Sequence, residues 1–164
     1  MARPLRRHVE SDPALNVVLV EPQIPPNTGN VARLCAATRC HLILVEPLGF
    51  ALSDATLRRA GLDYWDYVSW ELLPSLDALW PRVTPGTFHF LSTHAEAPYT
   101  HMPVARGHFL IFGKETAGLP KSLLKQYPDK CYAIPMLERG VRSLNLSSAV
   151  AVVVYDALRR ILPF

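Results

Sequence analysis

The sequence predicts an α/β domain built on a mostly parallel β-sheet with helices on both faces. Short, continuously apolar segments rich in Val, Ile and Leu recur along the chain, and segments of helical periodicity lie between them. A strand that is apolar at every position is buried on both faces, which is typical of a parallel sheet covered by helices. In such sheets ligands bind beyond the carboxyl ends of the strands. The loops that follow the strands are therefore the expected location of a functional site.

The 164 residues predict a flexible polar extension at 1–14 followed by one domain at 15–164. Hydrophobic residues make up 49 % of the chain, enough for a full core, and the net charge of +3 is far below that of a histone-like binder. Three cysteines without a CxxC pair predict reduced thiols in a cytoplasmic protein. The six histidines lack the spacing of metal ligands, and no apolar run is long enough for a membrane span or a secretory signal. Neither a metal nor a membrane is therefore expected.

Two predicted strands flank the first predicted helix. Residues 15–20 (LNVVLV) and 41–46 (HLILVE) are the strands, and between them the segment 27–30 (NTGN) leads into a helix that extends to about residue 39. On this helix Asn30 and Arg33 fall on a face away from the apolar stripe, close to the helix N-terminus. The spacing therefore brings an amide and a guanidinium together beside the loop that follows the first strand.

The remaining elements continue the alternation of strands and helices. The middle of the chain predicts a short helix, an aromatic-rich segment compatible with a short strand, a helix, a third strand and a loop, at 53–60, 62–70, 71–80, 87–93 and 95–106. The C-terminal third predicts a strand, a helix, a strand and a helix, at 107–112, 119–126, 130–134 and 145–162. Asn145 supplies a side-chain oxygen that starts the last helix, although the Val-rich middle of that segment is also compatible with a strand.

Three loops follow predicted strands and precede predicted helices, at 22–30, 113–120 and 135–145. The second contains Gly113 and Gly118, which serve either the turn alone or the close approach of a ligand to the backbone. It is not a Walker A loop, because Leu119 and Pro120 stand where Lys and Ser or Thr would be needed. No GxGxxG follows the first strand, so a Rossmann dinucleotide site is also disfavoured.

Each polar candidate in these loops has both a structural and a functional interpretation. Glu115 either caps a neighbouring backbone amide or contacts a ligand. The arginines are either solvated or bind phosphate, which applies to Arg33, Arg139 and Arg142. Ser143 and Asn145 either form a capping pair or line a site. Because no Ser-His-Asp order or locally supported Cys-His pair is evident, nucleophilic catalysis is disfavoured. The residues alone predict a polar, loop-built site for an anion or a nucleic acid.

At these loops the sequence resembles the SPOUT (SpoU-TrmD) RNA methyltransferases. Residues 27–33 (NTGNVAR) resemble the first motif of the family, NxGNxxR, and residues 112–119 (FGKETAGL) resemble the second, FGxExxGL. Residues 134–136 (IPM) and 143–147 (SLNLS) resemble the third. The motifs occur in the order of the family and at strand-to-helix junctions. The resemblance extends from residue 15 to about residue 162.

Within the family, the chain most resembles the small tRNA 2′-O-methyltransferases of the wobble nucleotide, through residues 21–30, 46–50 and 57–64. The resemblance implies a deep C-terminal trefoil knot and an obligate homodimer. It also implies methyl transfer from S-adenosylmethionine to the ribose 2′-hydroxyl of cytidine or uridine 34, with S-adenosylhomocysteine as product. The implied partner is the anticodon stem-loop of tRNA, with leucine isoacceptors as the expected substrates. Two alternatives remain: methylation of another tRNA position or of rRNA, and a non-catalytic module that binds S-adenosylmethionine or RNA.

The resemblance also assigns roles to individual residues. Catalytic roles fall on Asn30, Arg33, Glu115, Ser143 and Asn145. Cofactor contacts, mostly through the backbone, fall on Leu91, Ser92, Thr93, Gly113, Glu115, Gly118, Ile134, Met136, Ser143 and Leu144. RNA contacts fall on Arg33, Arg139 and Arg142. Because arginine stays protonated in proteins, we expect Arg33 to position phosphate and hydroxyl groups rather than to act as a base. Asn145 is expected to orient groups near the methyl, and no metal is required.

Overall fold

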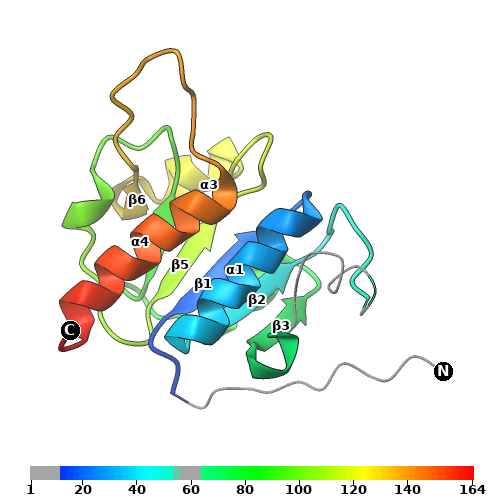
Figure 1. Ribbon diagram of the computed structural model, residues 1–164. Coiled ribbons are helices and arrows are strands. Elements are labelled where there is room, and N and C mark those ends of the chain that lie inside the picture. Colours follow the sequence, from blue (N-terminus) through cyan, green and yellow to red (C-terminus); the bar gives the residue numbers. More distant parts are fainter. Residues whose placement is uncertain (1–11, 54, 56–63) are drawn as a thin grey trace.

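The computed structural model describes residues 12–53, 55 and 64–164, which contain a six-stranded sheet with helices on both faces (Figure 1). The strands are β1 (Asn16–Val20), β2 (His41–Val45), β3 (Ser69–Leu73), β4 (Phe88–Leu91), β5 (Phe109–Phe112) and β6 (Cys131–Tyr132). They are ordered β3-β2-β1-β5-β4-β6, and each neighbouring pair is parallel. The predicted α/β architecture is confirmed, and the sheet of the described residues is parallel throughout.

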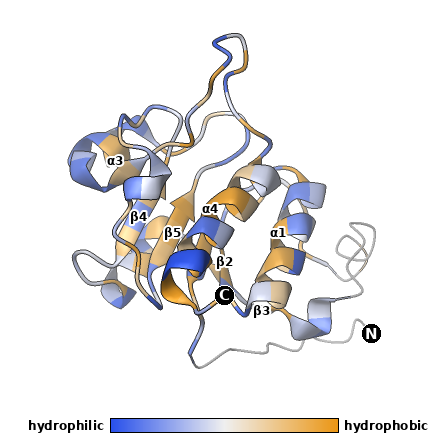
Figure 2. Ribbon diagram, turned by 60° about the vertical axis from the view of Figure 1, so that its left-hand side comes forward, coloured by the Kyte–Doolittle hydropathy of each residue, from blue (hydrophilic) through white to orange (hydrophobic). Residues whose placement is uncertain are grey.

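Helices cover both faces of this sheet. The helices are α1 (Pro25–Thr38), α3 (Lys121–Gln126) and α4 (Leu146–Ile161), with short 3-10 helices at Trp65–Tyr67, Leu76–Arg82, Tyr99–His101 and Pro128–Lys130. The helices α1 and α4 lie on one face, and they share a core cluster with Val17 and Leu19 of β1 (Figure 1). Val18 and Val20 alternate with these residues along β1 and belong to a second core cluster. Helix α3 and the 3-10 helix at Leu76–Arg82 cover this second cluster. Apolar residues concentrate in the strands, and apolar and hydrophilic residues alternate along the helices (Figure 2).

The predicted helix at 71–80 is wrong. Strand β3 runs to Leu73, and a 3-10 helix follows only at Leu76–Arg82. The reason is the pairing of β3 with β2, which aligns Ser69 with His41 and continues residue by residue. Helical spacing of leucines is a local signal, whereas this pairing joins segments far apart in the chain. The short strand predicted within 62–70 accordingly begins only at Ser69.

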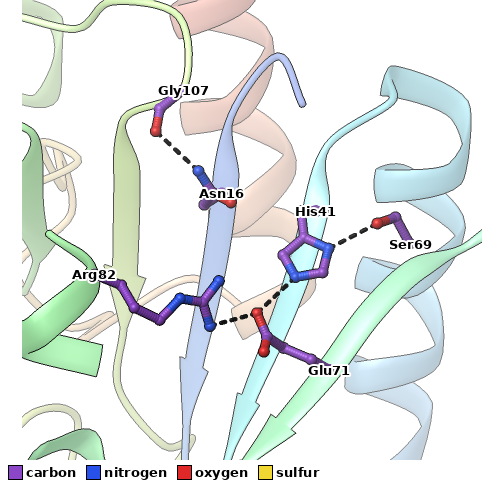
Figure 3. Close-up of polar contacts among 6 residues, drawn as sticks. All are labelled: Asn16, His41, Ser69, Glu71, Arg82 and Gly107. Atoms are coloured by element: carbon purple, nitrogen blue, oxygen red, sulfur yellow. Dashed lines mark hydrogen bonds and ion pairs between the residues drawn. The ribbon is translucent and has the colours of Figure 1, made fainter. Parts of the chain in front are cut away.

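Polar side chains near the amino ends of β2 and β3 hold these two strands in register (Figure 3). His41 Nδ1 lies 2.7 Å from Ser69 Oγ, and its Nε2 lies 2.9 Å from Glu71 Oε1. Arg82, from the following 3-10 helix, pairs with the same carboxylate oxygen of Glu71. Burial would raise the pKa of Glu71, but the hydrogen bonds from His41 and Arg82 lower it overall. Glu71 is therefore a strand residue bound on two sides, which a helix at this position would not allow.

Other predicted boundaries shift by a few residues. The first helix begins at Pro25, so residues 25–30 of the loop predicted at 22–30 already form its first turns. Two prolines with fixed φ suit this helix start. Helix α3 begins at Lys121, so Pro120 precedes it and does not occupy its first turn. The predicted strand at 130–134 shortens to Cys131–Tyr132, with a single further bridge between Ala133 and Pro98. The last predicted element is confirmed as a helix. Almost all of the helix predicted at 53–60 and residues 1–11 of the predicted extension lie outside the described residues.

Within the described part of the chain, no helix has the length and apolar character needed to cross a membrane.

Candidate active site

The three predicted loops meet at the carboxyl edge of the sheet, and Glu115 joins the first two. Its Oε2 accepts a hydrogen bond from the Gln23 amide nitrogen at 2.8 Å, and its Oε1 accepts one from the Ile24 amide nitrogen at 3.0 Å. Both amides lie immediately before α1, where a helix leaves amides without internal partners and favours a negative charge. Of the two interpretations of Glu115, the amide cap is thus confirmed by geometry. This cap fixes loop 22–30 against loop 113–120.

Asn27 connects this pair of loops to the third loop. Its Nδ2 lies 3.3 Å from Glu115 Oε1, and its Oδ1 accepts a hydrogen bond from Asn145 Nδ2 at 2.9 Å. The side chain is only 5 % exposed. Sequence analysis did not assign Asn27 a role, although it is the first residue of the motif NTGN. Its burial and its two partners arise only when the loops come together.

Asn145 is the N-cap of α4, as predicted. Its Oδ1 accepts hydrogen bonds from the amides of Ser147 at 2.9 Å and Ser148 at 3.3 Å, and from Ser147 Oγ at 2.6 Å. The capping interpretation is therefore confirmed for Asn145, and the partner is Ser147 rather than Ser143. The Asn145 side chain thus accepts hydrogen bonds from the first amides of α4 through Oδ1 and donates one to Asn27 through Nδ2. These bonds fix the end of loop 135–145.

The glycines of the second loop serve the turn itself. Gly118 has a φ of +66°, a conformation that L side chains rarely adopt, and its amide donates to the Lys114 carbonyl at 2.9 Å. A Cβ on Gly113 would lie 2.1 Å from the carbonyl carbon of Gly118, so the loop folds back directly over Gly113. Thr116 adds a link to the first loop, since its Oγ1 donates to Gln23 Oε1 at 2.8 Å. The second loop is thus a compact, rigidly held turn.

Asn30 and Arg33 lie on the exposed side of α1, as predicted. The Arg33 guanidinium carbon lies 4.9 Å from the centre of the Tyr64 ring, a cation–π distance. The described structure gives Arg33 no hydrogen bond to Glu115 or Asn145, so these residues form two separate groups. The buried network holds the loops, and Arg33 remains at the surface beside them.

Loop 135–145 rises above the carboxyl edge of the sheet between β6 and α4 (Figure 1). Arg139, Arg142 and Ser143 are exposed on it. A local turn shapes its tip, where Glu138 Oε1 accepts from the Gly140 amide at 2.9 Å. The two arginines therefore reach solvent on the most projecting part of this edge.

The predicted cofactor positions lie beyond three adjacent strands, β5, β4 and β6. The Ser92 amide donates to the Tyr132 carbonyl at 2.9 Å, which places the end of β4 beside the end of β6. Ile134 and Met136 are half-buried, and Thr93, Ser143 and Leu144 are exposed. The backbone groups of Ile134, Met136 and Leu144 form no hydrogen bond within the described structure. These backbone groups are therefore available to a ligand beside partly buried apolar side chains. The described residues contain no cluster of three or more His, Cys, Asp or Glu side chains that could hold a metal ion.

Comparison with known proteins identifies relatives over nearly the whole chain. The SpoU rRNA Methylase family matches residues 14–155. A tRNA (cytidine(34)-2′-O)-methyltransferase of Saccharophagus degradans is 46 % identical over 147 residues, which cover 89 % of this chain and 95 % of that protein. The protein of the same name from Burkholderia cenocepacia is also 46 % identical over 147 residues, covering 88 % and 94 %.

A solved structure gives the same result at the level of the fold. It was described in work on 2-OH methylation of C/U34 on tRNA, and it aligns with a TM-score of 0.81 at 42 % identity. The alignment covers 89 % of this chain and 95 % of that one. The family match, the two relatives and this structure all include the three loops that meet at the carboxyl edge. The chain therefore belongs to the SpoU methylase family.

Proposed function

We propose that this chain transfers a methyl group from S-adenosylmethionine to the ribose 2′-hydroxyl of nucleotide 34, cytidine or uridine, of tRNA. One observation carries the proposal: relatives named for this reaction are 46 % identical over most of both chains. The site supports it, because the motif-bearing loops meet at the edge of the sheet where ligands of parallel sheets bind.

The residues beyond β4, β5 and β6 fit S-adenosylmethionine. Leu91, Ile134 and Met136 offer partly buried apolar surface for the adenine, and the free backbone groups around them are available for polar edges. When bound, S-adenosylmethionine supplies a methyl group on a positively charged sulfur. The chain contributes the alignment: the Glu115–Asn27–Asn145 network holds all three loops, so their backbone groups are preorganised.

The remaining assigned residues would act on the RNA. Arg33 and Asn30 share the exposed side of α1, where a guanidinium can hold a phosphate through two parallel hydrogen bonds. Arg33 then positions the ribose, and the hydroxyl proton passes to phosphate or water. Arg139 and Arg142 would contact the RNA from the projecting loop, with Ser143 at its base.

The proposal includes a knotted, dimeric and cytoplasmic protein. Supporting the knot, the chain contacts the loop after β4 both before α4 and in the last turn of α4: the Tyr99 amide donates to the Ala133 carbonyl at 2.8 Å, and Arg160 donates to the Met102 carbonyl at 2.6 Å. Supporting the dimer, Val152 and Tyr155 of α4 are 39 % and 49 % exposed. Supporting the cytoplasm, the three cysteines are free and buried.

Labelled-methyl transfer from S-adenosylmethionine into bulk tRNA, followed by nuclease mapping, tests the proposal. A 2′-O-methyl group at nucleotide 34 is the expected result. A mark at another tRNA nucleotide, or in rRNA only, would overturn the substrate. Binding of S-adenosylmethionine without transfer to any RNA would overturn the catalytic function.

A further inference from the structure

Two groups of basic side chains on the described surface differ in their partners. In the first group each arginine is paired with a carboxylate of this chain: Arg82 with Glu71, Arg106 with Asp12, and Arg159 and Arg160 with Asp156. Such pairing offsets the positive charge locally and reduces its attraction for an external anion. These side chains therefore offer little to a negatively charged partner.

The second group lies at the carboxyl edge of the sheet and is not paired in this way. Lys121 and Lys125 of α3, and Arg139 and Arg142 of loop 135–145, form no ion pair within the described part of the chain. All four lysines of the protein fall between residues 114 and 130. The segment 113–145 carries six basic and three acidic side chains, so its net charge of +3 equals that of the whole chain. One of the six, Lys114, is paired with Glu21 of the first loop at 3.4 Å. Positive charge is thus concentrated on one segment.

Two of the three carboxylates of this segment accept hydrogen bonds from backbone amides. Glu115 is engaged with the amides of loop 22–30, as described above. Glu138 accepts from the Gly140 amide within its own loop. Asp129 is the third, and it follows α3 in the adjoining 3-10 helix.

One side of helix α3 is polar and faces solvent. Leu123 and Leu124 pack against the second core cluster, whereas Lys121 and Lys125 are exposed one helical turn apart. The helix directly follows loop 113–120, and it lies at the same end of the sheet as loop 135–145 in both views (Figures 1 and 2). Its two lysines therefore extend the basic surface beyond the three site loops.

We propose that the Lys121–Lys125 side of α3 binds the phosphate backbone of the tRNA substrate while the three loops hold the target nucleotide. This inference rests on the proposed function and adds a second contact surface to it. Charge complementarity selects RNA as the occupant, because unpaired lysines are flexible point charges that suit phosphates of any sequence. The contact positions the RNA and does not enter the reaction.

The test compares the double variant K121Q/K125Q with the wild-type enzyme. The control R106Q/R159Q removes the same net charge from paired positions elsewhere. For K121Q/K125Q we expect a roughly tenfold higher KM for tRNA, with kcat at saturating tRNA and KM for S-adenosylmethionine unchanged. The slope of log Kd for tRNA against log salt should fall by about one unit per lost contact. The control should retain wild-type values.

Three outcomes would overturn the inference. An unchanged KM and salt slope in K121Q/K125Q would show that the RNA does not reach α3. An equal loss in R106Q/R159Q would show a general effect of net charge and not a surface on α3. A wild-type protein that does not methylate tRNA would remove the proposed function, and the inference with it. In the first two outcomes the wild-type enzyme still methylates tRNA, so the failures are distinguishable.

Discussion

Asn27 accepts a hydrogen bond from Asn145 at 2.9 Å, across 118 positions of sequence. The same side chain lies 3.3 Å from Glu115, so a single buried amide contacts residues of the second and third loops from within the first. A buried amide of this kind is sensitive to change, because its removal takes one hydrogen bond from each of its partners. The three loops therefore form one cooperative unit.

Replacement of Asn27 by Ala tests this unit. We expect the free energy of unfolding to fall by about 1–3 kcal/mol, because Asn145 Nδ2 and one Glu115 oxygen lose a partner. Urea unfolding followed by circular dichroism measures the change. N30A on the exposed side of the same helix is the control, and it should shift the value by less than about 0.5 kcal/mol. Equal losses in both variants would contradict a special role of Asn27.

Replacement of Glu115 by Gln retains the shape of the side chain and removes its charge. One of its oxygens becomes an NH₂ group, which faces the Gln23 or Ile24 amide as donor against donor. We expect a loss of about 1–3 kcal/mol in stability together with weaker methyl transfer. Differential scanning calorimetry and single-turnover kinetics give the two values. Full stability with lost activity would instead assign Glu115 to the ligand alone.

Arg33 provides a test of bidentate positioning. Lys at this position keeps the charge but loses the planar fork, so we expect kcat/KM for tRNA to fall roughly 100-fold through misplacement of the RNA. Because Arg33 is exposed, the unfolding midpoint of R33K should stay at the wild-type value. Near wild-type turnover in steady-state methylation assays would rule out the two-point contact.

The dependence of stability on pH follows from a buried histidine on β4. Burial first, and then the nearby positive charge of His108, Lys130 and Arg160, lower the pKa of His89 from 6.5 to about 4. Its Nε2 lies 3.0 Å from His108 Nδ1, and burial lowers the pKa of His108 as well. Below pH 6.5 His89 is protonated in the unfolded chain but stays neutral in the folded chain until the pH approaches 4. Stability should therefore fall as the pH drops from 6.5 to about 4, and level off below that for this group.

Chemical unfolding at several pH values measures this effect. In H89Q the fall between pH 6.5 and 4 should be reduced, whatever the absolute stability of the variant. H94Q, at an exposed position in the loop after β4, is the control and should keep the wild-type profile. A profile of H89Q that parallels the wild type would show that another group is responsible.

The proposed dimer predicts a change of mass for variants of α4. V152D and Y155D together place two charges on an exposed apolar surface, so they should shift the protein from dimer to monomer. Multi-angle light scattering after gel filtration measures the mass. F164D at the 70 % exposed last residue is the control and should remain dimeric. A wild-type monomer, or a dimeric double variant, would contradict this interface.

Much of the fold can be predicted because its signals are local. After the first residues Asn16 and His41, the runs at β1 and β2 are apolar at every position, as is the run at β5, and this pattern indicates strands buried on both faces. Asn145 before an apolar segment indicates a capped helix, and α4 begins at the next residue. Each of these features depends on neighbours within a few positions, which is the range that sequence patterns cover.

The errors arise where distant segments decide the structure. Leu72, Leu76 and Leu79 have helical spacing, yet residues 71–73 form a strand. Pairing with β2 and the contacts of Glu71 with His41 and Arg82 decide this. The role of Asn27 was not predicted for the same reason, because its partners Glu115 and Asn145 are 88 and 118 positions away in the sequence. A motif marks such a residue without indicating its contacts.

The sequence by itself determined that the protein is an α/β domain with three polar loops after strands, because apolar runs and capping residues act over short distances. It also determined the family, since the residues of each loop motif lie within a short stretch of sequence. Only the tertiary structure decided that Glu115 caps the entrance to α1, that Asn27 and Asn145 join the loops, and that unpaired basic residues gather at one edge. These relations depend on the order of strands in the sheet, which brings together residues that no local pattern connects.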